Sequence, residues 1–432
     1  MSDTRLFSYW DRLRTSFWFL PTAMASGTIA FSFALVELDA AVSADWIEKR
    51  GWLASFGPEG ARAVLSAIAS SMITVASLTF SITMLTLQLA SSQFGPRLLR
   101  NFMRDRGNQI VLGTFISTFV YCLLILRTVR GTEESSFVPH LSVAFGVLLA
   151  LTSIAVLIYF IHHVATAIRI ESLLKMLAQE TREAIDRLYP ECLGRDPPGN
   201  EPSPEEVVRI SNSDQSICAE ANGYVQRVDV DALMGIATEH DLVLVVNTRP
   251  GCFVTERDAI FRVRAADRVS DKVADLLRGT FVLGQERTPD QDLEFSIRRI
   301  VEIAQRALSP GINDPTTALY CIDRLGEAFR LLADRDIPAP MRFDEKRHLR
   351  IITQVYSFDE LVCPAFAAIA RYGLADADVV MRLLDTMNVV QKAAGPEQSV
   401  NLAMLSEQLR RECEDQLDLE FDRRAVHGLV RA

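Results

Sequence analysis

Residues 63–96, AVLSAIASSMITVASLTFSITMLTLQLASSQFGP, contain no charged side chain between Arg62 and Arg97. As a helix, these 34 residues would extend roughly 50 Å, more than the ~30 Å hydrocarbon core of a bilayer. The run therefore predicts a membrane-spanning helix near 64–92.

Polar side chains are unusually frequent in this helix and take 12 of the 27 positions from Ser66 to Ser92. Six of them recur at helical spacing and predict one polar stripe: Ser66, Ser70, Thr74, Ser77, Ser81 and Gln88. Lipid offers such a stripe no hydrogen-bond partner, so it must face protein or water. Two interpretations stay open, which are close helix packing through small residues and the lining of a water-filled path.

Three further charge-free runs accompany the first one, with 22, 20 and 34 residues: Thr15–Val36, Gly107–Leu126 and Ser135–Ile168. Each is apolar and long enough to cross a bilayer. None of the three carries a comparable hydroxyl stripe, as expected if one helix per subunit lined a symmetric pore. We predict four transmembrane helices, near 16–37, 64–92, 109–127 and 141–166.

The charges that flank these runs predict their orientation. Arginines and lysines dominate the N-terminus, the loop after the second run and the segment after the fourth: Arg5, Arg12, Arg14, Arg97, Arg100, Arg104, Arg106, Arg169, Lys175 and Arg182. The other two loops are balanced in charge. The positive-inside rule therefore places both termini in the cytoplasm of a bacterium, with the protein as a multi-pass inner-membrane protein.

Residues 169–432 are acidic, with 33 basic and 45 acidic side chains. This balance argues against nucleic-acid binding. The seven cysteines form no C-x-x-C pair, so we expect reduced thiols and no metal site. We divide the chain into a four-helix membrane domain (1–168), an amphipathic stalk helix (169–189), a Pro-rich linker (190–215), a small β module (216–266) and a helical cytoplasmic domain (267–432). The predicted fold class is membrane all-α plus a cytoplasmic α+β domain.

Local signals place turns and helix starts in the second half. Gly223 and Gly251 are expected to serve turns. Thr288 is expected to cap a helix that begins at Pro289, with Gln291 reaching back, and Asp314 to cap the next helix. Further helices are predicted over 345–372, 376–394 and 397–420.

Two more groups are candidate sites. Arg97, Arg100, Arg104 and Arg106 form a basic patch just inside the membrane, which sets topology, contacts anionic lipid headgroups or forms an electrostatic ring at a pore mouth. The second group either forms a capped turn between helices or offers an anion contact at a helix N-terminus: Asn313, Asp314, Thr316 and Thr317. Adjacent His162 and His163 point about 100° apart on a helix and cannot chelate one ion together.

Four segments resemble the bacterial "domain of unknown function 2254" family of predicted membrane proteins: QLASSQFGPRLL (88–99), GYVQRVD (223–229), PGCFV (250–254) and RALSPGINDPTTA (306–318). The resemblance extends over nearly the whole chain. It implies membrane-protein character and transfers no catalytic or binding residue.

The leading functional hypothesis is a homo-oligomeric channel or pore-like transport protein, with the second helix lining the path and the cytoplasmic domain regulating it. One alternative is a membrane-anchored sensor or scaffold without a pore. A weaker alternative is a membrane-bound enzyme, although the sequence carries no P-loop, nucleophile elbow or paired-carboxylate motif. No cofactor is expected, and the predicted partners are the lipid bilayer and further copies of the chain.

Overall fold

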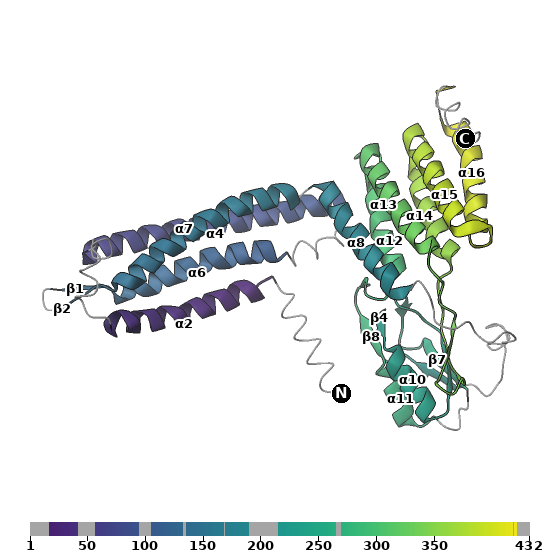
Figure 1. Cartoon of the computed structure of the whole chain (residues 1–432), viewed down its shortest axis with the longest axis horizontal. Coiled ribbons are helices and arrows are strands. Elements are labelled where there is room, and N and C mark those ends of the chain that lie inside the picture. Colours follow the sequence, from purple (N-terminus) through teal and green to yellow (C-terminus); the bar gives the residue numbers. More distant parts are fainter. Residues whose placement is uncertain are drawn as a thin grey trace. The chain divides into compact units, whose positions relative to one another are not determined.

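The computed structural model describes residues 17–41, 57–94, 105–132, 135–167, 169–189, 215–264, 269–417 and 419–420. The chain divides into two compact units, Met1–Ser172 and Leu173–Ala432 (Figure 1). Each unit is described by itself below.

Within its described residues, the first unit contains four helices that are long enough and apolar enough to cross a membrane. These are α2 (Phe19–Ala41), α4 (Pro58–Phe94), α6 (Arg106–Thr128) and α7 (His140–Ala167), and a small hairpin of β1 (Arg130–Thr132) and β2 (Ser135–Phe137) joins the last two. The four helices lie alongside one another, and α6 packs against the other three (Figure 1). All four predicted helices are confirmed, with ends that differ from the expected ones by a few residues.

A buried carboxylate fixes the start of a helix at one end of this bundle. Asp39, near the end of α2, is buried and accepts hydrogen bonds from the backbone amides of Leu141 and Ser142, at 2.9 and 2.8 Å, and from the Ser142 hydroxyl at 2.5 Å. Asp39 therefore caps the N-terminus of a different helix, α7. The hydroxyl of Tyr121 on α6 donates to the Ser142 carbonyl at 2.8 Å, so three helices meet at this point.

The second unit contains two sheets. The larger has the order β3-β7-β5-β10-β9, formed by Gln215–Cys218, Ala259–Arg264, Val243–Val246, Leu349–Ile352 and Met341–Phe343. Only the β5–β10 pair in this sheet is parallel. The smaller sheet has the antiparallel order β6-β4-β8, formed by Phe253–Val254, Gly223–Val228 and Phe281–Gly284. Helices α10 (Val230–Glu239) and α11 (Asp271–Arg278) complete the β-rich part.

The β-rich part is larger than predicted, because β8, β9 and β10 come from residues 267–432, where helix alone was expected. The expected helix over 345–372 is wrong for Leu349–Ile352, whose backbone pairs with β5 about a hundred residues earlier. A run of four residues is too short for its period to separate a strand from a helix end.

The described part of the second unit also contains five longer helices beyond residue 290: α12 (Leu293–Ala307), α13 (Pro315–Ala333), α14 (Phe358–Gly373), α15 (Ala377–Gln398) and α16 (Val400–Gln416). The capping residue of α12 is Asp292 rather than Thr288, so that expectation is wrong. Gln291 instead bonds to both backbone groups of Val228 on β4, which ties the loop to the smaller sheet. The predicted cap by Asp314 is confirmed.

The amphipathic helix predicted over 169–189 is confirmed as α8 (Ile170–Leu188). Its buried side chains include Leu173, Leu174, Leu177 and Ile185. Glu180 pairs with Arg299 of α12 at 2.5 Å, and Asp186 pairs with Arg335, just after α13, at 2.5 Å. Within the second unit, α8 is thus an integral part of the packing. The expected linker lies almost entirely outside the described residues.

Candidate functional site

The hydroxyl stripe lies on the outward face of α4. Every one of its six members is exposed: Ser66, Ser70, Thr74, Ser77, Ser81 and Gln88. The opposite face packs against α6 and α7 and is buried, with small and apolar side chains that include Leu65, Ala69, Met72 and Ala76. At roughly 100° per residue, the stripe and the packing face point in nearly opposite directions. Packing among the described helices of one chain therefore does not account for the stripe.

Three hydroxyl protons of the stripe are used locally. Ser70 donates to the Ala67 carbonyl at 3.1 Å, Thr74 to the Ser70 carbonyl at 2.9 Å, and Ser81 to the Ser77 carbonyl at 2.9 Å. Such bonds to the preceding turn are common for hydroxyls in membrane helices. With these three protons engaged, the oxygen lone pairs of Ser70, Thr74 and Ser81 remain as outward hydrogen-bond acceptors without fixed charge.

An apolar strip runs beside these hydroxyls on the same exposed side of α4. Leu78, Leu85 and Leu89 are 58%, 56% and 44% exposed. The helix therefore presents two adjacent surfaces of different chemistry, and the leucine surface is the one suited to lipid.

Three of the four arginines of the predicted basic patch lie outside the described residues: Arg97, Arg100 and Arg104. Arg106 is the exposed first residue of α6. Next to it, Asp105 caps α6 by accepting from the Gly107 amide at 2.8 Å, and its second oxygen lies 2.5 Å from His163 Nε2. Sequence analysis missed this pair because its members are 58 positions apart.

Asn313 and Asp314 end the connection between α12 and α13, and Thr316 and Thr317 lie in the first turn of α13. The Asp314 carboxylate accepts from the backbone amide of Thr317 at 3.1 Å and from its hydroxyl at 2.6 Å. Asn313 is exposed and has a positive φ of 50°, which asparagine tolerates better than most residues. The capped turn is confirmed, and the anion contact stays a prediction at a helix end that a carboxylate already occupies.

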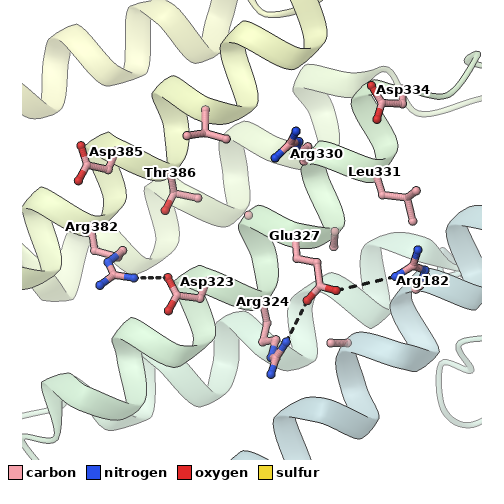
Figure 2. A pocket seen from close by; sticks show the side chains of 14 residues that line it. Arg182, Asp323, Arg324, Glu327, Arg330, Leu331, Asp334, Arg382, Asp385 and Thr386 are labelled. Carbon is pink, nitrogen blue, oxygen red and sulfur yellow. Dashed lines mark hydrogen bonds and ion pairs between the residues drawn. The ribbon is translucent and has the colours of Figure 1, made fainter. Parts of the chain in front are cut away.

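An open groove of about 660 Å³ is lined by α8, α13 and α15 (Figure 2). Its floor is a close crossing, because a Cβ on Gly326 would lie 2.5 Å from Thr386 Cγ2. Three ion pairs cross its surface, joining Arg382 to Asp323 at 2.6 Å, Arg324 to Glu327 at 3.0 Å and Arg182 to Glu327 at 3.9 Å. Exposed pairs of this kind contribute little and are typical of a solvated surface.

A buried charged cluster lies near the start of α12. Arg287 donates to both oxygens of the Asp292 carboxylate, at 2.7 and 2.8 Å, and also bonds to Glu294. The Asp292 side chain is 1% exposed. Gly251 approaches it so closely that a Cβ there would lie 2.2 Å from Asp292 Oδ2, and its φ of 92° also favours glycine. The predicted turn role of Gly251 is therefore confirmed.

Burial and neighbouring charge shift the pKa values of these two carboxyl groups in opposite directions. Burial alone would raise the pKa of Glu294, but hydrogen bonds and charge from Arg287 and Arg298 outweigh burial and lower it. For Asp292 burial raises the pKa, against the opposing effect of Arg287. The spacing of these residues forms no recognised motif, and their partner Gly251 lies some forty positions upstream, so one sequence offered no signal for the cluster.

Metal-ligating side chains do not gather in the part of the chain that the structure describes, where no group of three or more His, Cys, Asp or Glu could hold an ion. The six cysteines in that part form no disulfide.

Comparison with known proteins gives the family. A family model described as "Predicted membrane protein (DUF2254)" matches residues 14–388. The chain is 34% identical over 426 residues to the uncharacterized protein Rv1290c of Mycobacterium tuberculosis. This match covers 94% of this chain and 79% of the mycobacterial protein. The same values hold for the uncharacterized protein Mb1321c of Mycobacterium bovis. No solved structure matches the chain.

The chain belongs to the DUF2254 family of predicted membrane proteins, which confirms the resemblance seen in the sequence. Its four long apolar helices fit a multi-pass membrane location.

Proposed function

We propose that this protein is a homo-oligomeric membrane channel in which the hydroxyl stripe of α4 lines a polar path near the symmetry axis. The observation that carries the proposal is the exposure of all six stripe residues on a side of α4 that no other helix covers among the residues that the structure describes. A ring of identical subunits would turn this side toward a shared axis, where it meets water instead of lipid.

The chemistry of the stripe supports weak interaction with a permeating species. Ser70, Thr74 and Ser81 present acceptor oxygens, because their protons are held by backbone carbonyls. Acceptors without fixed charge can replace part of the hydration shell of a cation, or carry water, without holding it tightly. Permeation requires such weak binding, since a tightly bound ion does not leave. The path would therefore favour cations or water over anions.

The proposed location is the inner membrane of a bacterium, with both termini in the cytoplasm and the second unit acting as a regulatory domain. Arginines on the predicted inner loops support this orientation. Alkaline phosphatase fused after residue 50 or 135 should be active, whereas fusions after 105 or 432 should be inactive. An active fusion after 432 would reverse the orientation.

Cross-linking in native membranes tests the oligomer. Ser77→Cys lies on the stripe, and the matched control Leu78→Cys lies on the neighbouring leucine strip, both in a background in which the seven native cysteines are replaced by alanine. A short bifunctional thiol reagent should produce cross-linked dimers from Ser77→Cys and mainly monomer from Leu78→Cys. Monomer from both variants would instead favour a membrane-anchored sensor or scaffold.

A further inference from the structure

A small cavity of about 170 Å³ lies between α12 and α14 in the second unit. Residues at helical spacing on α12 form one wall: Glu294, Ile297, Arg298 and Val301. Tyr356 and the first turns of α14 form the other wall. This volume is below the 300–1,000 Å³ typical of pockets for drug-sized ligands, so the cavity fits a molecule of few atoms.

The inner part of the cavity is aliphatic. Ile297, Val301, Leu361 and Ala365 line it, and each of them is at most 5% exposed. An apolar group placed against them would leave water without displacing any hydrogen-bonded partner. The ligand body that this wall selects is a short aliphatic chain.

Glu360 supplies hydrogen-bond acceptors at the rim. One of its carboxylate oxygens accepts from the Ser357 amide at 2.8 Å, and its other oxygen has no partner among the described residues. Pro364 lies within α14 four positions later and has no N–H, so the Glu360 carbonyl lacks its usual helical donor. A carboxylate oxygen and a carbonyl that lacks its usual helical donor, both on one residue, suit an ammonium group.

Arg298 and Tyr356 supply donors. Nε and Nη2 of Arg298 both point to one oxygen of Glu294, at 3.1 and 3.0 Å, which leaves Nη1 available. Within the described part of the chain, the Tyr356 hydroxyl has no hydrogen-bond partner, and Arg249 lies 3.4 Å from the centre of its ring. Burial raises the pKa of Tyr356, so its hydroxyl stays protonated and can donate.

We propose that this cavity binds a small zwitterion with a short aliphatic body, which is the chemistry of an apolar α-amino acid. Its ammonium group would bind at Glu360, its carboxylate at Arg298 and Tyr356, and its body against Ile297 and Val301. A simple anion would leave Glu360 uncompensated, and a simple cation would leave the Arg298 donor unused. The site lies wholly within the second unit and holds whether or not α4 lines a path.

Calorimetric titration of the full chain in detergent with L-leucine tests the proposal. We expect saturable binding at millimolar concentrations. 4-Methylpentanoate, which lacks the amino group, and isopentylamine, which lacks the carboxylate, should each bind at least about tenfold more weakly, because each loses a charge-assisted contact. Absence of L-leucine binding, or equal binding of either analogue, would overturn the proposal.

Two variants that preserve the fold test the acceptors. Pro364→Ala returns an N–H to the Glu360 carbonyl, and Glu360→Gln keeps a side chain that can complete the capping box at Ser357. Both should weaken L-leucine binding about tenfold, whereas Asp385→Asn, in the open groove, should leave it unchanged. Unaltered binding in both variants, with folding verified by circular dichroism, would contradict the assigned site.

Discussion

Helices α4 and α6 are both long enough to cross a membrane, but most polar side chains of α4 are exposed, with Thr79 and Thr83 as buried exceptions, whereas several polar side chains of α6 are buried. The polar residues Asn108, Gln109, Ser117 and Thr118 of α6 are buried within the bundle. Thr118, for example, lies 3.1 Å from the Ser153 hydroxyl of α7. The stripe of α4 instead faces away from the bundle.

This difference separates two uses of polar groups in a membrane helix. Those of α6 serve packing within the chain, as is common where membrane helices meet. The stripe of α4 makes no hydrogen bond to another helix in the described part of the chain, and we propose that its partner is another copy or water. The four predictions that follow begin with buried polar contacts and end with the exposed stripe.

The largest effect is expected where a buried charge loses its partner. Arg287→Met should destabilise the second unit by about 3–5 kcal/mol, since it leaves the Asp292 carboxylate buried and unpaired. Urea unfolding monitored by circular dichroism would measure this change. Arg324→Met breaks an exposed pair and should cost less than about 1 kcal/mol. Equal costs for the two variants would contradict the importance given to burial.

In the membrane unit, Asp39→Ala should destabilise by about 1–3 kcal/mol. The variant leaves the buried amides at the start of α7 without an acceptor. Thermal unfolding in detergent would show a lower midpoint. Glu37→Ala, two positions earlier and exposed, should unfold like the unaltered protein. If both variants behaved alike, the helix-capping role of Asp39 would be wrong.

Acid should reveal the contribution of Glu294. Because its folded pKa lies below the ordinary value of about 4.3, ionised Glu294 stabilises the fold above that pH, and the stabilisation is lost as pH falls through the folded pKa. Glu294→Gln should therefore be less stable than the unaltered protein at pH 7, with a difference that shrinks in acid. Asp292 is present in both proteins, so its opposite effect cancels in the difference between their free energies of unfolding. A difference that does not change with pH would contradict the stabilising role assigned to ionised Glu294.

The smallest stability effects are expected from single hydroxyls. Thr118→Val should cost about 0.6 kcal/mol, the average for hydrogen bonds between membrane helices. Thr74→Val should leave the stability of the single chain unchanged but reduce cation flux through liposomes that contain the protein. Thermal unfolding and a flux assay with a fluorescent potassium indicator measure the two quantities. Normal flux in Thr74→Val would weaken the proposed path.

Features that depend on a local sequence pattern, such as an apolar run or a helical spacing, were predictable from the sequence. Charge-free runs located the four helices, and the spacing of Ser66 to Gln88 defined one face of α4. Contacts between distant segments were not predictable. Strand β10 is specified by pairing with β5, and the cluster at Arg287 by the approach of Gly251, neither of which leaves a local pattern. The direction of the stripe also needed the structure, because the spacing defines a face but not what covers it.

The central claim is that the hydroxyl side of α4 contacts water. Single cysteines from Ser66 to Leu89, in a Cys122→Ala background, should be treated in native membranes with a small charged thiol reagent, and labelled positions identified by mass spectrometry. The account predicts reaction at helical period, strongest at residues 70, 74, 77 and 81 and weak at 78, 85 and 89. Strongest reaction at the three leucine positions, or no reaction along the helix, would contradict it.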